Sequence, residues 1–142
     1  MNGIKQMTQK VYAGGFLYNF QTNSVLLHKR DSKTKINPNL WGFFGGLSED
    51  VETPRVAFVR ELKEELNITV HVDDLIPLCD YMNEELHIYR YTFYVESSLK
   101  KTEMRLGEGE DFDWIPINKV FGYDLTKYTK RDLKLFIERR GV

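Results

Sequence analysis

The sequence is poor in cysteine and contains no long hydrophobic run. Cys79 is the only cysteine, so no disulfide can form within the chain, which is typical of proteins from reducing compartments. No apolar stretch reaches the roughly 20 residues that a membrane-spanning helix needs. The first ten residues, MNGIKQMTQK, lack the apolar core of a signal peptide. We therefore expect a cytoplasmic protein without a membrane partner.

The sequence also lacks an excess of charge of either sign. Its 142 residues include 20 Lys and Arg against 21 Asp and Glu, which gives a net charge of −1. Such a chain has no overall field to attract nucleic acid, so an anionic ligand would have to be held locally, by a metal ion or by a few basic side chains. Repeats and low-complexity linkers are missing too, and 42% of the residues are hydrophobic. This composition predicts one globular domain over residues 1–142.

Short strands interrupted by two helices make up the rest of the pattern. Thr53 followed by Pro54 is a helix start, and Asn67 is a residue type that closes a helix in the left-handed conformation. A second helical pattern runs from about residue 125 to residue 139, with Leu133 and Phe136 among its core positions. Strands are predicted over residues 11–20, 24–30, 40–44, 68–72, 75–82, 86–96, 104–106 and 111–115. This order predicts an α/β fold in which helices cover the faces of a mixed sheet.

The first helix carries carboxylates in unfavourable places. Glu61, Glu64 and Glu65 lie on the side of the helix opposite its apolar stripe. An ordinary solvated face would explain them, but Glu61 and Glu65 form a repulsive i,i+4 pair near the helix C-terminus, where the helix dipole disfavours anions. Clustered hard oxygen ligands are what Mg²⁺ or Mn²⁺ needs. The helix is therefore predicted to bind a metal ion.

Directly before this helix stands the pair Gly45-Gly46. The pair could form an ordinary turn between strand and helix. It could also allow the backbone to approach a ligand closely, because glycine has no side chain in the way. In the second case the carbonyl of Gly45 would add one more oxygen ligand.

The segment from Gly46 to Ile68 resembles the Nudix box. The pattern of that box is Gly, five residues, Glu, seven residues, then Arg-Glu-apolar-x-Glu-Glu-x-Gly-apolar. This chain places Asn67 where the box has its last Gly, and it has Phe44 where many members have Pro. The residues that match the pattern are Gly46, Glu52, Arg60, Glu61, Leu62, Glu64, Glu65 and Ile68. The resemblance implies the family's α/β/α sandwich with a mixed central sheet.

The resemblance also implies an activity, the metal-dependent hydrolysis of a phosphoanhydride bond in a nucleoside diphosphate linked to another group, X. On this basis, Glu64 and Glu65 are the best candidates for metal ligands. Glu61 would be a third ligand or would orient or deprotonate water, and Arg60 would orient the carboxylates by charge-assisted hydrogen bonds. Glu52 would support the site from behind, although it could equally be an exposed residue before the helix.

Other residues are candidates to complete the site. Some family members use a later acid as ligand or general base; here Glu108 and Glu110 are available, and we favour Glu110. Substrate contacts are predicted for Gly46, Arg30 and Arg90, although Arg30 could be a solvated strand-end charge and Arg90 a snorkelling surface side chain. The aromatic residues that either stack a base or belong to the core are Trp41, Tyr89, Tyr91 and Trp114.

The substrate itself is less well defined by the sequence. A proline downstream of the box marks many ADP-ribose hydrolases of the family, and this chain has Asn83-Glu84-Glu85 there. The short chain resembles members that act on nucleoside triphosphates, oxidised nucleotides or similar small nucleotides. Nucleotide sugars and dinucleoside polyphosphates stay open. The alternative is a catalytically silent nucleotide sensor, and the sequence leaves both a monomer and a homodimer open.

Overall fold

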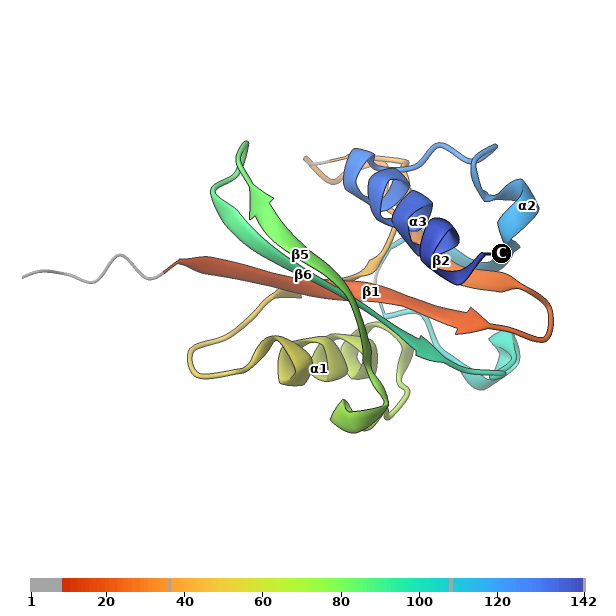
Figure 1. Cartoon of the computed structure of the whole chain (residues 1–142), viewed down its shortest axis with the longest axis horizontal. Coiled ribbons are helices and arrows are strands. Elements are labelled where there is room, and N and C mark those ends of the chain that lie inside the picture. The colour runs from red at the N-terminus through yellow and green to blue at the C-terminus, as the bar shows by residue number, and fades with distance from the viewer. Residues whose placement is uncertain (1–8, 36, 108, 142) are drawn as a thin grey trace, which may run out of the picture.

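A computed structural model describes residues 9–35, 37–107 and 109–141, and in it a mixed β-sheet carries one long helix on each face (Figure 1). The strands are β1 (Lys10–Asn19), β2 (Ser24–Lys29), β3 (Trp41–Gly42), β4 (Phe44–Leu47), β5 (Ile76–Asn83), β6 (Ile88–Glu96) and β7 (Asp111–Pro116). The helices are α1 (Pro54–Leu66), α2 (Ile117–Val120) and α3 (Lys127–Arg140), with single 3₁₀ turns η1 (Val72–Asp74) and η2 (Lys101–Glu103). The predicted α/β/α architecture is confirmed.

Strand β1 is the centre of the sheet. One of its edges pairs in parallel with β6 along its whole length, so that Tyr12 stands opposite Arg90. Its other edge pairs antiparallel first with β4, where Gly14 faces Gly45, and then with β2. Strand β5 extends the sheet beyond β6, while β3 and β7 pair with β2. This mixed pairing brings the glycines of β4 and the arginine of β6 to opposite sides of the same stretch of β1.

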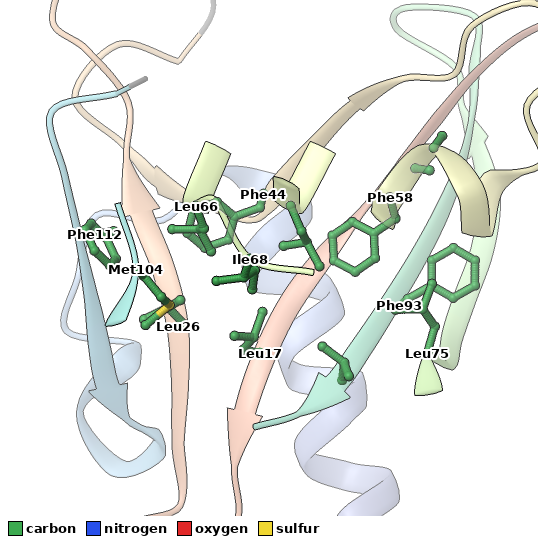
Figure 2. Packing of buried hydrophobic residues seen from close by; sticks show 14 residues of the cluster. Leu17, Leu26, Phe44, Phe58, Leu66, Ile68, Leu75, Phe93, Met104 and Phe112 are labelled. Carbon is green, nitrogen blue, oxygen red and sulfur yellow. The ribbon is translucent and has the colours of Figure 1, made fainter. Parts of the chain in front are cut away.

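Two apolar cores hold the layers together. Between the sheet and α1, Phe44 and Leu17 pack against Phe58, Leu62 and Leu66 of the helix (Figure 2). On the opposite face, fully buried Leu133 and Phe136 of α3 pack against Phe16 and Tyr18. Side chains of the strand predicted over residues 86–96 alternate between the two cores, since Phe93 and Val95 join the first core and Tyr94 the second.

Helix α1 begins and ends where the capping residues predict. The Thr53 side chain accepts a hydrogen bond from the Val56 N–H, and Asn67 adopts φ 56° and ψ 38°. A later loop then closes the end of the helix, because Arg105 N donates to the Leu66 carbonyl and Gly107 N to the Glu65 carbonyl. The C-terminal turn of α1, which carries Glu65, is therefore tied down from both directions.

Three strand predictions were wrong or incomplete. Residues 68–72 and 104–106 form no strand. In the first segment, Ile68 is buried against α1, and both edges of β1 are already paired with other strands. In the second segment, Arg105 N donates to the Leu66 carbonyl at the end of α1. The single strand predicted at residues 40–44 is divided into β3, which pairs with β2, and β4, which pairs with β1.

Within the described part of the chain, no helix is both long and apolar enough to cross a membrane.

His28 of β2, to which the sequence assigns no role, is buried in the sheet with 5% of its surface exposed. Its Nε2 donates to the Phe43 carbonyl at 3.0 Å, and its ring stacks on Phe44 with centroids 4.7 Å apart. Burial lowers the pKa of His28 from 6.5 to about 4. The imidazole is therefore neutral in the folded protein at any pH near neutrality.

We expect His28 to make the protein less stable as the pH falls from about 6.5 towards 4. In that window the unfolded chain binds a proton at this histidine and the folded chain does not, so the loss amounts to about 3 kcal/mol in total. A His28→Gln variant should lose less stability over the same window in urea unfolding at several pH values. His71→Gln, at an exposed histidine, is the control and should follow the wild type; a His28 variant with the wild-type slope would contradict the prediction.

Candidate functional site

Arg60 of α1 gathers the carboxylates of the predicted metal site. Its Nε and Nη2 donate to the two oxygens of Glu52 at 2.7 and 3.1 Å. Its Nη1 donates to Glu61 Oε2 and to Glu64 Oε2, both at 3.1 Å. Nη2 also donates to the Leu47 carbonyl of β4. One side chain thus joins the helix face, the strand and the connection between them, and the supporting role of Glu52 stays a prediction.

The charges of this network reinforce one another. The hydrogen bond from Arg60, aided by one from the Glu49 N–H, lowers the pKa of Glu52 below its ordinary value. In return the hydrogen bond to Glu52 raises the pKa of Arg60 further above its already high value. Both groups are therefore charged at neutral pH, and the ion pair between them holds the guanidinium in place against Glu61 and Glu64.

The three glutamates differ in their burial, which the helical pattern did not predict. The Glu64 side chain is 57% exposed and the Glu61 side chain 15% exposed, whereas Glu65 is buried at 4%. The expectation that all three point away from the sheet was wrong for Glu65. Its Oε2 accepts a hydrogen bond from Gly45 N at 3.0 Å, because β4 runs along this edge of α1.

Gly45 and Gly46 lie within strand β4 and not in a turn. Gly45 adopts φ +148°, and a Cβ there would stand 2.5 Å from the Ala13 carbonyl oxygen. A Cβ on Gly46 would stand 2.4 Å from Glu61 Oε2. The two glycines are therefore needed because the carboxylates of α1 and the backbone of β1 come up against the strand.

A cavity of about 440 Å³ opens on the other side of these glycines. Three residues with a predicted substrate contact, Arg30, Arg90 and Gly46, line it together with Gly45. Their roles stay predictions, but they come from three different strands or strand ends and meet at one cavity. Its remaining wall includes Tyr12, Phe43, Asn83 and Tyr128.

Tyr12 connects the cavity with the carboxylates, and the sequence reading missed this position. Burial raises the pKa of Tyr12, with further contributions from Glu65 and Glu61, against the opposing charges of Arg90 and Arg30. The hydroxyl therefore keeps its proton and can act as a donor. The only signal in the sequence was the alternation of aromatic residues along the first strand, and that pattern equally fits a core position.

Other predicted residues are not among the described residues that line the cavity, and the role of Glu110 stays a prediction. Glu110 forms an ion pair with Lys29 Nζ at 3.2 Å, and its N–H donates to the Lys29 carbonyl, which holds it at the end of β2; Glu108 lies outside the described residues. The described lining of the cavity includes none of the four aromatic residues proposed for base stacking. Trp41 packs near α3, Trp114 Nε1 donates to the Leu99 carbonyl, and the Tyr89 hydroxyl binds Asp80.

The donor set fits a hard divalent cation in its chemistry. Among residues 9–35, 37–107 and 109–141, no three acidic, histidine or cysteine side chains are already grouped as metal ligands. Glu61 and Glu64 instead face the guanidinium of Arg60, and Glu65 faces a backbone N–H. Glu61 and Glu65 nevertheless both lie at the edge of α1 that faces β4, Glu61 beside Gly46 and Glu65 beside Gly45, and Glu64 shares the guanidinium of Arg60 with Glu61. Carboxylate oxygens at such an edge are suitable ligands for Mg²⁺ or Mn²⁺.

Comparisons with known proteins agree with this geometry. The model of the NUDIX domain matches residues 8–138. An 8-oxo-dGTP diphosphatase from Proteus vulgaris is 34% identical over 90 residues, which are 60% of this chain and 80% of that protein. The nucleoside triphosphatase NudI from Escherichia coli is 26% identical over 123 residues, or 79% of this chain and 86% of that one. A structure from a study of MutT from Aliivibrio salmonicida and Vibrio cholerae superposes with a TM-score of 0.76 at 21% identity, covering 93% and 99% of the two chains.

Proposed function

Because the chain belongs to the NUDIX domain family, whose members are pyrophosphohydrolases that typically depend on a divalent metal ion, we propose that it cleaves a phosphoanhydride bond in a nucleoside diphosphate linked to a group X. The substrate that we favour is a nucleoside triphosphate, with oxidised nucleotides included. The names of two relatives, an 8-oxo-dGTP diphosphatase and a nucleoside triphosphatase, support this class of substrate.

The observation that carries the proposal is that β4, the strand that contains Gly45 and Gly46, borders both the carboxylates and the cavity. On one side, Gly45 and Gly46 contact the carboxylates of Glu65 and Glu61. On the other side, the same glycines line the cavity that holds Arg30 and Arg90. A diphosphate lying along this strand would have acidic metal ligands on one side, and its nucleoside would enter a cavity of suitable size on the other.

Each residue of the network then has a part in hydrolysis. Glu61, Glu64, Glu65 and the carbonyl of Gly45 would hold Mg²⁺ or Mn²⁺, which when bound neutralises phosphate charge and activates water. Arg60 orients the carboxylates of Glu61 and Glu64 through the hydrogen bonds of its Nη1. Glu61 would accept a proton from the attacking water. The oxygen of that water bonds to phosphorus, and the bridging P–O bond breaks so that the other phosphate-containing product leaves with the bridging oxygen. Arg30 attracts the phosphates from the cavity side.

A panel of nucleoside triphosphates, nucleotide sugars and dinucleoside polyphosphates, with product analysis by chromatography, tests this function. We expect hydrolysis of at least one nucleoside triphosphate to the monophosphate and inorganic diphosphate, dependent on Mg²⁺ or Mn²⁺ and abolished by EDTA. Tight nucleotide binding without turnover would favour the sensor alternative instead. Turnover that EDTA does not affect would contradict the metal assignment.

A further inference from the structure

Arg90 occupies an unusual position for a charged side chain. It lies in β6, inside the sheet, with Tyr12 of β1 and Tyr81 of β5 as its neighbours in register. Only 9% of its surface is exposed, so it is not the snorkelling surface residue that the sequence allowed. Burying a guanidinium costs free energy unless other groups compensate for the lost water. The surroundings of Arg90 therefore indicate what it is kept for.

Aromatic rings surround the guanidinium. Its Cζ lies 4.6 Å from the ring centroid of Tyr12, 5.4 Å from that of Tyr128 and 6.0 Å from that of Phe43. These distances are within the range of cation–π attraction. All three rings also line the cavity, as Arg90 itself does. The guanidinium is thus part of the cavity wall, fixed between aromatic faces.

A fully buried carboxylate supports Arg90 from α3. Asp132 has no exposed surface and accepts hydrogen bonds from the Tyr81 hydroxyl at 3.1 Å and from Thr92 Oγ1 at 3.0 Å. Its Oδ2 also lies 3.5 Å from Arg90 Nε, an atom that makes no hydrogen bond with any described residue. Asp132 does not belong to the cavity lining. The side chain of the cavity lining with which Asp132 forms an ion pair is Arg90.

Asn83, another polar residue of the cavity lining, is also restricted to donating through its side chain. Its Oδ1 accepts hydrogen bonds from the Tyr128 hydroxyl at 2.9 Å and from the N–H groups of Glu85 and Leu86 at 3.1 and 3.3 Å. The side chain can then offer a ligand only its amide N–H groups. An arginine has no acceptor at all. Together, Arg90 and Asn83 present donors to whatever planar group enters the cavity.

Extending the proposed function, on which this inference rests, we propose that Arg90 is the specificity-determining residue of the cavity and donates to the 6-keto oxygen of a purine base. Asp132 is the positioning residue that holds Arg90 there. A keto oxygen next to N7 offers two acceptors that match a guanidinium, whereas the 6-amino group of adenine would bring donors against donors. The enzyme should therefore prefer 6-keto purine nucleotides over adenine nucleotides.

The sharpest pair of substrates is dITP and dATP, because hypoxanthine carries a keto group at the purine position where adenine carries an amino group. We expect wild-type kcat/KM to favour dITP by about 10- to 100-fold. In Asp132→Asn, KM for dITP should rise towards that for dATP while kcat changes little. A purely structural role of Asp132 would instead lower the melting temperature and impair both substrates equally. Calorimetric titration with dIMP and dAMP, without metal, should give the same preference and the same loss.

Three further variants keep the test decisive. Thr92→Val removes one hydrogen bond to Asp132 but leaves its pairing with Arg90, so it should lower stability and retain the preference. Arg90→Lys keeps the charge without the planar fork and should lose the preference. If Asp132→Asn does not fold, the double variant Arg90→Met, Asp132→Leu replaces the ion pair by apolar groups, which proteins often tolerate, and should treat both nucleotides alike.

Two results would overturn the inference: equal use of dITP and dATP by the wild type, or a preference that survives in Arg90→Lys and in the double variant. Either result would leave the proposed hydrolysis intact. If no nucleotide is hydrolysed, the proposed function fails, but the titrations with dIMP and dAMP still decide whether Arg90 discriminates between the bases.

Discussion

A Glu65→Gln variant is expected to fold like the wild type and to lose metal-dependent hydrolysis by at least about 100-fold, since even residues that only support metal ligands affect activity by 10- to 100-fold. Glutamine has nearly the same shape, and its amide oxygen can still accept the hydrogen bond that Gly45 N donates at 3.0 Å. It lacks the negative charge that a metal ligand needs.

The loss of activity has to be measured as kcat/KM at saturating Mg²⁺, next to the melting temperature and the circular dichroism spectrum. Glu138→Gln makes the same chemical change at an exposed position of α3 and should leave kcat/KM unchanged. Near-wild-type turnover by Glu65→Gln would mean that Glu65 is no metal ligand. A large fall in melting temperature would mean that the charge of Glu65 is needed for folding.

Removal of Arg60 should have the second largest effect, and it should act on stability as well as on activity. Arg60→Gln deletes the donor that binds Glu52 through two hydrogen bonds and that separates Glu61 from Glu64. Because a hydrogen bond to a charged group contributes about 1.5–3 kcal/mol, we expect the metal-free variant to be less stable by about 2 kcal/mol or more. We also expect a loss of activity of about 10- to 100-fold, because the carboxylates are no longer oriented.

Thermal unfolding with and without millimolar Mg²⁺ separates these two effects. Metal that binds only the folded protein raises the melting temperature, and this rise should be clear in the wild type and smaller in Arg60→Gln. Lys63→Gln removes a cation from an exposed position of the same helix and should keep the wild-type rise. An undiminished rise in Arg60→Gln would show that Arg60 does not prepare the carboxylates for the metal.

The parts of the site that the sequence predicted are those that depend on neighbours along one helix. The start at Thr53, the end at Asn67 and the shared face of Arg60, Glu61 and Glu64 follow from local capping and helical periodicity. Glu52 lies within reach of Arg60 because only a short, capped connection separates it from the helix. Fixed spacing in such a segment leaves little freedom to the side chains.

The parts that the sequence did not predict depend on pairing between distant segments. Periodicity placed Glu65 away from the sheet, but the division of residues 40–47 between two partner strands brings Gly45 against it. The Ile68 segment has the composition of a strand and forms none, because the edges of β1 are already occupied. Tyr12 and Asp132 carried no sequence signal that separated them from ordinary core and helix positions.

By itself, therefore, the sequence determined the α/β class, the carboxylate helix and the family, since each follows from spacing along a continuous stretch of chain. Only the tertiary structure decided which carboxylate is buried, and that Arg30, Arg90 and the glycines meet at one cavity. The physical reason is that this burial and this cavity arise where β1 pairs with β4 and β6. Pairing of this kind joins residues far apart in the chain, and the pattern within one segment does not show which distant segment will be its partner.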